Sequence, residues 1–409
     1  MDFQHTDKVQ ALIAKLEAFM DEHVYPIEDE RHHWHHDPAN QWKRWPGTAG
    51  IKAKAREAGL WNLFLPKDYA PYSPGLTNLE YAPLAEIMGR VYGASELFNC
   101  AAPDTGNMEV LAKYGSPEQK AEWLEPLLAG EIRSSYAMTE PDVASSDATN
   151  IQTTIKRDGD DYIVNGRKWW ISGMMDPLTK LIIVLGRTSD DAPSHQRHTQ
   201  IIVPRDTPGV VVERPLTVFS ALHSPGGHVQ MRFDNVRVPK ENVILGEGRG
   251  FEIAQGRLGP GRMHHCMRAV GQAQRALELM CRRADSRVAF GRKLADQGSI
   301  RQDVAWSFCE IEQARLLTLK AADAIDRHGA KGARDLIAAI KVVAPRMAQT
   351  VADRAIQIHG GMGVSDDTPL AGIFATSRYL RLADGPDEVH LSQLGKLTIA
   401  KHVAEAGGR

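Results

Sequence analysis

Cysteine is scarce in this sequence, and the few cysteines it has are far apart. The 409 residues include only four, Cys100, Cys266, Cys281 and Cys309. None of them stands two to four residues from another, which excludes the paired-cysteine spacing of a structural zinc site. Four scattered cysteines also exclude a disulfide framework of the kind that secreted small domains use. We therefore expect four reduced thiols in the core of the fold.

The sequence also lacks an excess of charge of either sign and any long apolar run. Lys and Arg number 49 against 51 for Asp and Glu, a formal net charge of −2. This balance favours neither a nucleic acid nor an anionic membrane as partner. No stretch approaches the roughly 20 apolar residues of a transmembrane helix, and the N-terminus lacks the basic-then-apolar order of a signal peptide. We expect a cytoplasmic protein without membrane insertion.

One run of histidines could suggest a metal site. In Arg31-His32-His33-Trp34-His35-His36, His32 and His36 would share one face of a helix. No cluster of acidic or cysteine ligands accompanies the run, and Pro38 follows it closely. A polar surface segment is the simpler interpretation, so we predict no metal.

The hydrophobic period divides the chain into three regions. Residues 1–134 are predicted to be helical, with Thr6 or Asp7 as a first cap and a capping box from Ser116 to Gln119. In residues 135–248 the period becomes two, with turn residues between short runs, as in an antiparallel β-barrel or sandwich. In residues 249–409 helical patterns return over 251–285, 299–328, 335–359 and 388–403. The prediction is a multidomain α+β fold: an N-terminal helical domain, a middle β domain and a C-terminal four-helix bundle.

Two segments of the β region could hold a polarised ring. Residues 136–147 begin as a strand, meet Pro141 and continue into small and hydroxyl residues, so they expose N–H groups and hydroxyls. Residues 167–173 end a hairpin strand with two indoles and a hydroxyl. Together they resemble the flavin-binding signatures T-E-P-x-x-G-S-D and W-I-T/S of the acyl-CoA dehydrogenase family. The resemblance implies that FAD is contacted by Tyr136, Met138, Thr139, Ser145, Trp170 and Ser172.

The first signature is one residue longer here than in its common form. The pattern runs from Thr139-Glu140-Pro141 through Ser145 and Ser146 to Asp147. Either serine could take the role of the family's serine. We favour Ser146, which the resemblance places at the substrate.

Two further segments resemble the elements by which one subunit of the family holds its neighbour's dinucleotide. Residues 286–292 read S-R-V-A-F-G-R, like the family's R-x-x-F-G, and a guanidinium is a permanently charged fork for phosphate oxygens. Residues 357–363 read Q-I-H-G-G-M-G, like Q-I-x-G-G-x-G. Arg287, Phe290, Gln357 and Gly361 are the implied cofactor contacts. A homodimer or homotetramer is implied as well.

The fourth segment, residues 378–390, occupies the place of the family's Y-E-G-T-x-x-I-Q, whose glutamate is the catalytic base. By resemblance Asp384 is the base. The sequence D-G-P-D-E-V-H that begins at Asp384 is similar to that of a subgroup of the family acting on long-chain or substituted acyl-CoA. Some members carry the base just before the arginine of the first bundle helix, but glycine stands there in this chain. The resemblance also implies substrate contacts by Arg262 and Gly385, and cofactor contacts by Pro386 and Glu388.

The base segment departs from the family pattern in three ways. Aspartate is one methylene shorter than glutamate, Pro386 replaces a hydroxyl residue, and Glu388 replaces an amide. The resemblance further implies that the N–H two residues after the base holds the thioester carbonyl, and proline has no N–H. Either the carbonyl is held otherwise or the alignment slips locally.

The implied function is a flavin-dependent acyl-CoA dehydrogenase of fatty acid β-oxidation. The base takes a proton next to the thioester carbonyl, a hydride passes to FAD, and the product is a trans-2-enoyl-CoA. Electrons would then pass to an electron-transfer flavoprotein. Two alternatives remain open: a non-catalytic acyl-CoA-binding or scaffold protein, and a flavin oxidase or monooxygenase on the same fold.

Overall fold

The computed structural model describes residues 4–407, which fold into two compact units. The first unit comprises the chain up to Tyr25, Thr77–Ser95 and the chain from Gly259 onward. The second comprises Pro26–Leu76 and Glu96–Leu258. The helical N-terminal region therefore contributes to both units.

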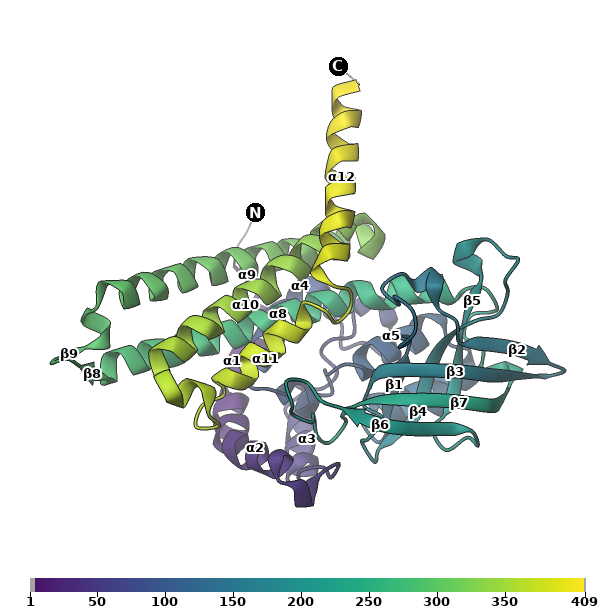
Figure 1. Ribbon diagram of the computed structural model, residues 1–409, viewed down its shortest axis with the longest axis horizontal. Helices are drawn as coiled ribbons and strands as arrows, with labels where there is room; N and C mark the ends of the chain where they lie inside the picture. Colours follow the sequence, from purple (N-terminus) through teal and green to yellow (C-terminus); the bar gives the residue numbers. More distant parts are fainter. Residues whose placement is uncertain (1–3, 408–409) are drawn as a thin grey trace. The chain divides into compact units, whose positions relative to one another are not determined.

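The first unit is built on the long helices of the C-terminal region. Helices α8, α9 and α10 follow one another in alternating directions, as in an antiparallel bundle (Figure 1). The four predicted helical segments correspond to α8, α9, α10 and α12, and α11 is an addition that the pattern did not predict. The helices of this unit are α1 (Asp7–Phe19), α4 (Asn78–Gly89), α8 (Gly250–Ser286, from Gly259 onward), α9 (Gly298–Gly332), α10 (Arg334–His359), α11 (Leu370–Leu380) and α12 (Asp387–Gly407), with the short strands β8 (Val288–Ala289) and β9 (Arg292–Lys293).

Charged side chains fasten α4 to α9. The carboxylate of Asp326 accepts hydrogen bonds from the backbone N–H groups of Asn78 and Leu79, each at 2.9 Å. These are among the first N–H groups of α4, which have no acceptor within their own helix. Arg315 of α9 also pairs with Glu86 of α4 at 2.8 Å. An early helix is thereby made part of the C-terminal bundle.

The second unit contains the main sheet and several short helices. Its sheet has the strand order β1-β4-β2-β3-β7-β6, with β5 also paired to β4. The strands are β1 (Arg133–Ala137), β2 (Thr154–Asp158), β3 (Asp161–Ser172), β4 (Thr179–Arg187), β5 (His198–Pro204), β6 (Val210–Leu216) and β7 (His228–Pro239). The helices are α2 (Glu28–His36), α3 (Thr48–Glu57), α5 (Asp104–Tyr114), α6 (Pro117–Gln119) and α7 (Glu125–Leu128), together with α8 up to Leu258.

Most strand pairings are antiparallel, as the sequence predicts, but β1 and β2 pair with β4 in parallel. Parallel neighbours need a long crossover, and the chain between β1 and β4 contains the whole β2–β3 hairpin. The sheet core is formed by aliphatic and aromatic side chains that alternate along the strands. It includes Ile155, Val164, Ile171, Ile182, Val184, Ile201, Val229, Met231, Phe233 and Val236.

Strand β3 is interrupted twice where it pairs with β7. The register shifts between Val164 and Gly166, and again between Lys168 and Ile171. At Gly166 a Cβ would stand 2.4 Å from the hydroxyl oxygen of Thr153, so no larger residue fits there. At the second irregularity Trp170 has φ +55°, a left-handed conformation that is costly for a bulky residue. Such strain is characteristic of functional sites.

The expectation of four thiols in the core is right for two cysteines and wrong for the other two. Cys100 and Cys266 are buried, but Cys281 and Cys309 are exposed on α8 and α9, and none of the four forms a disulfide. Between residues 4 and 407, no helix combines the length and hydropathy required to cross a bilayer. The same residues contain no group of three or more His, Cys, Asp or Glu side chains placed to hold a metal ion.

Candidate active site: two sets of predicted residues

A buried lysine holds the first predicted flavin segment. The ammonium of Lys168 donates to the backbone oxygens of Met138 and Leu185, both at 2.8 Å, and to Oε1 of Glu140 at 2.9 Å. The N–H of Trp169 donates to the backbone oxygen of Thr139 at 3.0 Å. The chain through Met138 and Thr139 is therefore fixed to β3 by both a side chain and the backbone.

Glu140 completes this buried ion pair. Its two carboxylate oxygens also accept the N–H groups of Gln152 and Thr153, each at 2.8 Å. Burial acts to raise the pKa of Glu140, but Lys168 and these N–H donors outweigh burial, so the pKa is lowered. Burial lowers the pKa of Lys168 to about 8, which leaves it protonated at neutral pH. Sequence reasoning missed Lys168 as a site residue, although it shares the buried parity of β3 with Tyr162 and Val164.

The two candidate serines have different environments. The hydroxyl of Ser145 is buried and accepts the N–H of Glu140 at 2.8 Å, which closes the turn after Pro141. Ser146 is exposed. The local structure therefore gives Ser145 an internal task and leaves Ser146 accessible to a ligand.

Trp170 and Ser172 lie at the end of β3 beside two histidines. The indole of Trp170 is 41% exposed, and its ring lies 5.9 Å from that of His228. Nδ1 of His228 is 2.8 Å from the Ser172 hydroxyl, and Nε2 of His228 is 3.0 Å from Nδ1 of His223. Burial lowers the pKa of His228 to about 4, so its imidazole is neutral at pH 7. Neither histidine carries a sequence signal that reveals this contact.

Tyr136, the first residue of the predicted flavin segment, is held from two sides. The side-chain amide of Gln200 donates to its hydroxyl at 3.0 Å. The guanidinium of Arg257 lies 3.9 Å from the centre of its ring, a cation–π contact. Arg257 in turn donates to the side chain of Asn107 at 3.2 Å. The predicted segment is thus rigid at Tyr136 as well as at Met138.

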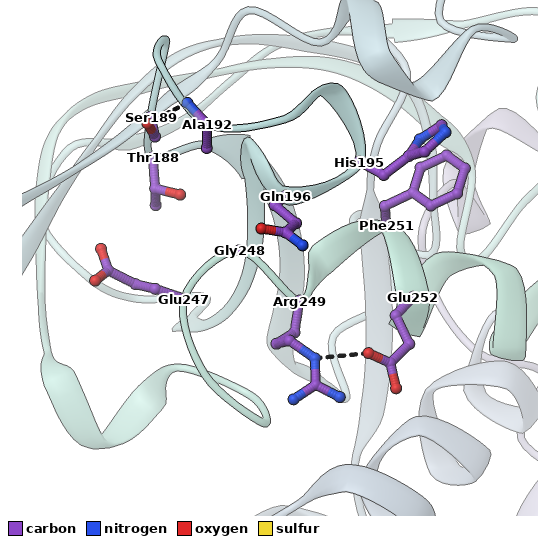
Figure 2. Close-up of a pocket in the computed structure, with 10 residues that line it drawn as sticks. All are labelled: Thr188, Ser189, Ala192, His195, Gln196, Glu247, Gly248, Arg249, Phe251 and Glu252. Atoms are coloured by element: carbon purple, nitrogen blue, oxygen red, sulfur yellow. Dashed lines mark hydrogen bonds and ion pairs between the residues drawn. The ribbon is translucent and has the colours of Figure 1, made fainter.

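A pocket of about 560 Å³ opens beside the start of α8 in the second unit (Figure 2). The ring of His195 stacks on that of Phe251, with centroids 4.3 Å apart. Arg249 precedes the helix and contacts Glu252 at 2.6 Å. The N-terminus of α8 favours anions, whereas the two lining carboxylates, Glu247 and Glu252, oppose them, and Arg249 is already paired with Glu252. Sequence reasoning did not identify this pocket.

Asp384, the predicted base, lies in a strained turn of the first unit. Its φ is +56°, between α11 and α12. The backbone oxygen of Asp384 accepts Nε of Arg262 at 3.0 Å and Nε2 of His390 at 3.2 Å. The ammonium of Lys341 donates to the preceding carbonyls of Leu380 and Ala383, at 2.6 and 2.8 Å. Helices α8, α10 and α12 therefore each supply a basic side chain that holds this turn.

The Asp384 carboxylate faces a fourth basic group. Its Oδ2 is 3.5 Å from Nε2 of His265, and both side chains are about one quarter exposed, at 27% and 25%. Burial lowers the pKa of His390 to about 4, so that ring is neutral. Burial also lowers the pKa of Arg262, against the effect of the nearby Asp384. The carboxylate is thus partly open to solvent, while the turn that carries it is held firmly.

The residues after Asp384 begin α12. Gly385 has φ +105°, and a Cβ there would lie 2.9 Å from the His390 ring. The backbone oxygen of Pro386 accepts the N–H groups of Val389 and His390, so proline immediately precedes the first residue of the helix, where its missing N–H costs no intrahelical hydrogen bond. Glu388 is exposed.

The remaining predicted cofactor contacts lie elsewhere in the first unit. Arg287 is exposed, and Phe290 is fully exposed at the tip of the β8–β9 hairpin with φ +52°. Gln357 and Gly361 are exposed at the C-terminal end of α10. In Figure 1 the hairpin and this end of α10 lie toward one end of the bundle, away from the turn between α11 and α12. The structure therefore separates these four residues from Asp384.

Comparison with known proteins gives consistent matches along the chain. The N-terminal, middle and C-terminal domains of acyl-CoA dehydrogenase match residues 6–131, 135–236 and 248–398. Acyl-CoA dehydrogenase family member 10 of Mus musculus is 55% identical over 96% of this chain and 36% of its own length. The Mycobacterium tuberculosis protein named "Probable acyl-CoA dehydrogenase FadE2" is 53% identical over 98% of both chains. The chain thus spans about a third of the mouse relative and nearly all of the mycobacterial one.

Solved structures agree with these matches. A Mycobacterium abscessus protein provisionally described as an acyl-CoA dehydrogenase has a TM-score of 0.95, with 51% identity over 98% of this chain and 100% of its own. Butyryl-CoA dehydrogenase of Megasphaera elsdenii has a TM-score of 0.82, with 26% identity over 98% of this chain and 100% of its own. The sequence resemblance and the predicted fold are thereby confirmed. This chain belongs to the acyl-CoA dehydrogenase family of enzymes.

Proposed function

We propose that this protein binds FAD and oxidises an acyl-CoA to the trans-2-enoyl-CoA, with Asp384 as the base. The observation that carries the proposal is the Asp384 turn, where a left-handed aspartate is held by Arg262, His390 and Lys341 while its carboxylate stays accessible. A base must approach the proton it takes to about 3 Å, so its carrier has to be rigid. The four segments that resemble the family's site support the same assignment.

The residues of the flavin segments fit a flavin ring. Lys168 fixes the backbone at Met138 and Thr139, and Trp170 presents a partly exposed indole beside the Ser172 hydroxyl. Backbone groups, a hydroxyl and a flat aromatic face are the contacts that a planar heterocycle with polar edges requires. When bound, FAD would supply the hydride acceptor, which protein side chains cannot provide. The chain's own part is to hold the ring, orient the acyl group and take the α-proton at the Asp384 carboxylate.

The pocket beside α8 suits the nucleotide part of CoA. Phosphates are favoured by the helix N-terminus, where Arg249 would have to exchange Glu252 for a phosphate, and the neighbouring rings of His195 and Phe251 offer aromatic faces to a base. Ser146, being exposed, and Arg262 remain the proposed contacts to the acyl part of the substrate. We propose fatty acid β-oxidation as the setting and an electron-transfer flavoprotein as electron acceptor.

A homodimer or homotetramer is part of the same proposal. Arg287, Phe290, Gln357 and Gly361 are all exposed. Phe290 is fully exposed on a hairpin where Val288 is exposed as well, so the hairpin presents apolar side chains that a neighbouring subunit could cover. We propose that these residues complete the dinucleotide site of a neighbouring subunit. The three-domain division at residues 134 and 248 remains a prediction.

The test is anaerobic titration of the yellow holoenzyme with acyl-CoAs of increasing chain length. We expect one length class to bleach the flavin of the wild type, and Asp384→Ala to retain FAD but reduce it at least ~1,000-fold more slowly, in the range of a lost general base. Asp353→Asn, which alters an exposed acid of α10, is the matched control and should react normally. A protein that binds acyl-CoA but is never reduced would instead be a binding protein. Rapid reoxidation of the reduced flavin in air would indicate an oxidase.

A further inference from the structure

We propose that His265 is a positioning residue for the Asp384 carboxylate, and that Arg268 fixes the tautomer in which His265 acts. The inference rests on the proposed role of Asp384 as base. The three residues form a chain of contacts from Nη2 of Arg268 to Nδ1 of His265, at 3.2 Å, and from Nε2 of His265 to Oδ2 of Asp384, at 3.5 Å. Neither His265 nor Arg268 belongs to the segments that resemble the family's motifs.

The tautomer of His265 follows from the chemistry of its neighbour. A guanidinium carries only donors and stays protonated in proteins, so Nδ1 of His265 must offer its lone pair to Arg268. The ring proton of the neutral imidazole then resides on Nε2, the nitrogen that faces Asp384. His265 thereby presents an N–H donor to one carboxylate oxygen of Asp384.

The placement on α8 makes this chain rigid. His265 and Arg268 are three residues apart, so their side chains occupy neighbouring positions on one helix face. One carboxylate oxygen of Asp384 is thereby assigned to His265. The contact of 3.5 Å is at the long limit of a hydrogen bond, and catalytic contacts of this kind are commonly long without substrate.

The other groups around the carboxylate have fixed or engaged charges. Arg262 and Arg268 stay protonated, and burial raises the pKa of Cys266 to about 12 and lowers that of His390 to about 4. Lys341 is engaged with two carbonyls, and Asp387 is paired with Arg346 and Arg381. Desolvation raises the pKa of Tyr379. A change in pH dependence on altering His265 would therefore report on the His265–Asp384 contact itself.

The substitutions can separate a donor role from mere space filling. His265→Gln retains an N–H close to the position of Nε2, whereas His265→Leu keeps bulk and loses the donor. Loss of a hydrogen bond to a charged group corresponds to roughly 10–100-fold in rate. We expect His265→Leu to slow anaerobic flavin reduction by about that factor, with the acyl-CoA dissociation constant within about threefold. Its pH midpoint of reduction should rise by about one unit. His265→Gln should recover most of the rate.

A second measurement does not depend on turnover. Ring ¹⁵N chemical shifts of His265 in the wild-type holoenzyme should show a protonated Nε2 and an unprotonated Nδ1, and Arg268→Met should mix the two tautomers. A protonated Nδ1 in the wild type would overturn the proposal even if His265→Leu failed to fold. The proposal would also fail if a folded, FAD-loaded His265→Leu enzyme reduced its flavin at the wild-type rate with an unchanged pH midpoint. If Asp384→Ala itself were fully active, the proposed function would fail, which is a distinguishable result.

Discussion

The buried Lys168–Glu140 pair makes the flavin segment testable without any substrate. Lys168→Met keeps the length and apolar stem of the side chain but removes the charge that donates to Met138, Leu185 and Glu140. Two buried carbonyls then lose their donor, and the Glu140 carboxylate loses its cation. We expect a folded protein that is less stable and that retains FAD poorly, because the backbone at Met138 is no longer fixed.

The magnitude follows from the burial of both partners. The Lys168 and Glu140 side chains are 0% and 5% exposed. Removing one partner of such a pair costs about 3–5 kcal/mol, because the other charge stays buried without compensation. Glu140 keeps the N–H groups of Gln152 and Thr153, so a value near the lower end is expected. For a protein of this size the loss corresponds to a fall in melting temperature of roughly 3–6 °C.

The assay is a double-mutant cycle with thermal unfolding and flavin retention as readouts. Lys168→Met, Glu140→Gln and the double variant are compared with the wild type, and Arg237→Met, which breaks an exposed pair on β7, is the control. The double variant should be more stable than the sum of the single losses predicts, because neither charge is then left alone. Strictly additive losses, or a Lys168→Met protein as stable as the control, would refute this account of the segment.

Two further predictions concern groups that the sequence did not point to. Burial raises the pKa of Glu109 from 4.5 to about 8, so the folded protein keeps a proton that the unfolded chain has released. The contribution of Glu109 to the free energy of unfolding therefore falls by about 1.4 kcal/mol per pH unit from about pH 5 to 8. Glu109→Gln should remove this dependence on pH. The free energy of unfolding of the variant, measured by urea unfolding, should therefore exceed that of the wild type by more at pH 8 than at pH 5.5. The same difference at both pH values would contradict this account. His228→Ala should lower the flavin-to-protein absorbance ratio after desalting, because Ser172 loses its hydrogen-bond partner. His228→Asn should keep the wild-type ratio. Equal ratios for the two variants would exclude a role of this contact in flavin binding.

Local signals in the sequence were sufficient for element boundaries. Thr6 caps α1 by accepting the N–H of Val9, and both hydrogen bonds of the Ser116–Gln119 capping box are present. Such signals depend on residues three apart, so a single sequence contains them fully. The change of period at the start of the sheet was equally visible, because alternation along β3 reflects one buried face.

Long-range contacts could not be predicted in the same way. Arg262 and Asp384 are 122 residues apart, and Lys341 reaches the same turn from a third helix. Nothing in the spacing of these residues indicates that they meet. The left-handed conformation of Trp170 was hidden too, because tryptophan rarely adopts it and only the register shift against β7 reveals it. The family resemblance supplied the predicted site residues, whereas the contacts around them came from the fold.

The departures of the base segment from the family pattern are consistent with one another when the whole turn between α11 and α12 is considered. An aspartate reaches one methylene less far than a glutamate, so its position depends more strongly on the backbone that carries it. Here Arg262 and His390 both bind the carbonyl of Asp384, and Lys341 binds the carbonyl before it. Gly385 and Pro386 then lead directly into α12, and the helix needs no N–H from the residue that precedes it. The segment is therefore a rigid mount for the proposed base, and its geometry accommodates proline at that position without assigning it a catalytic hydrogen bond.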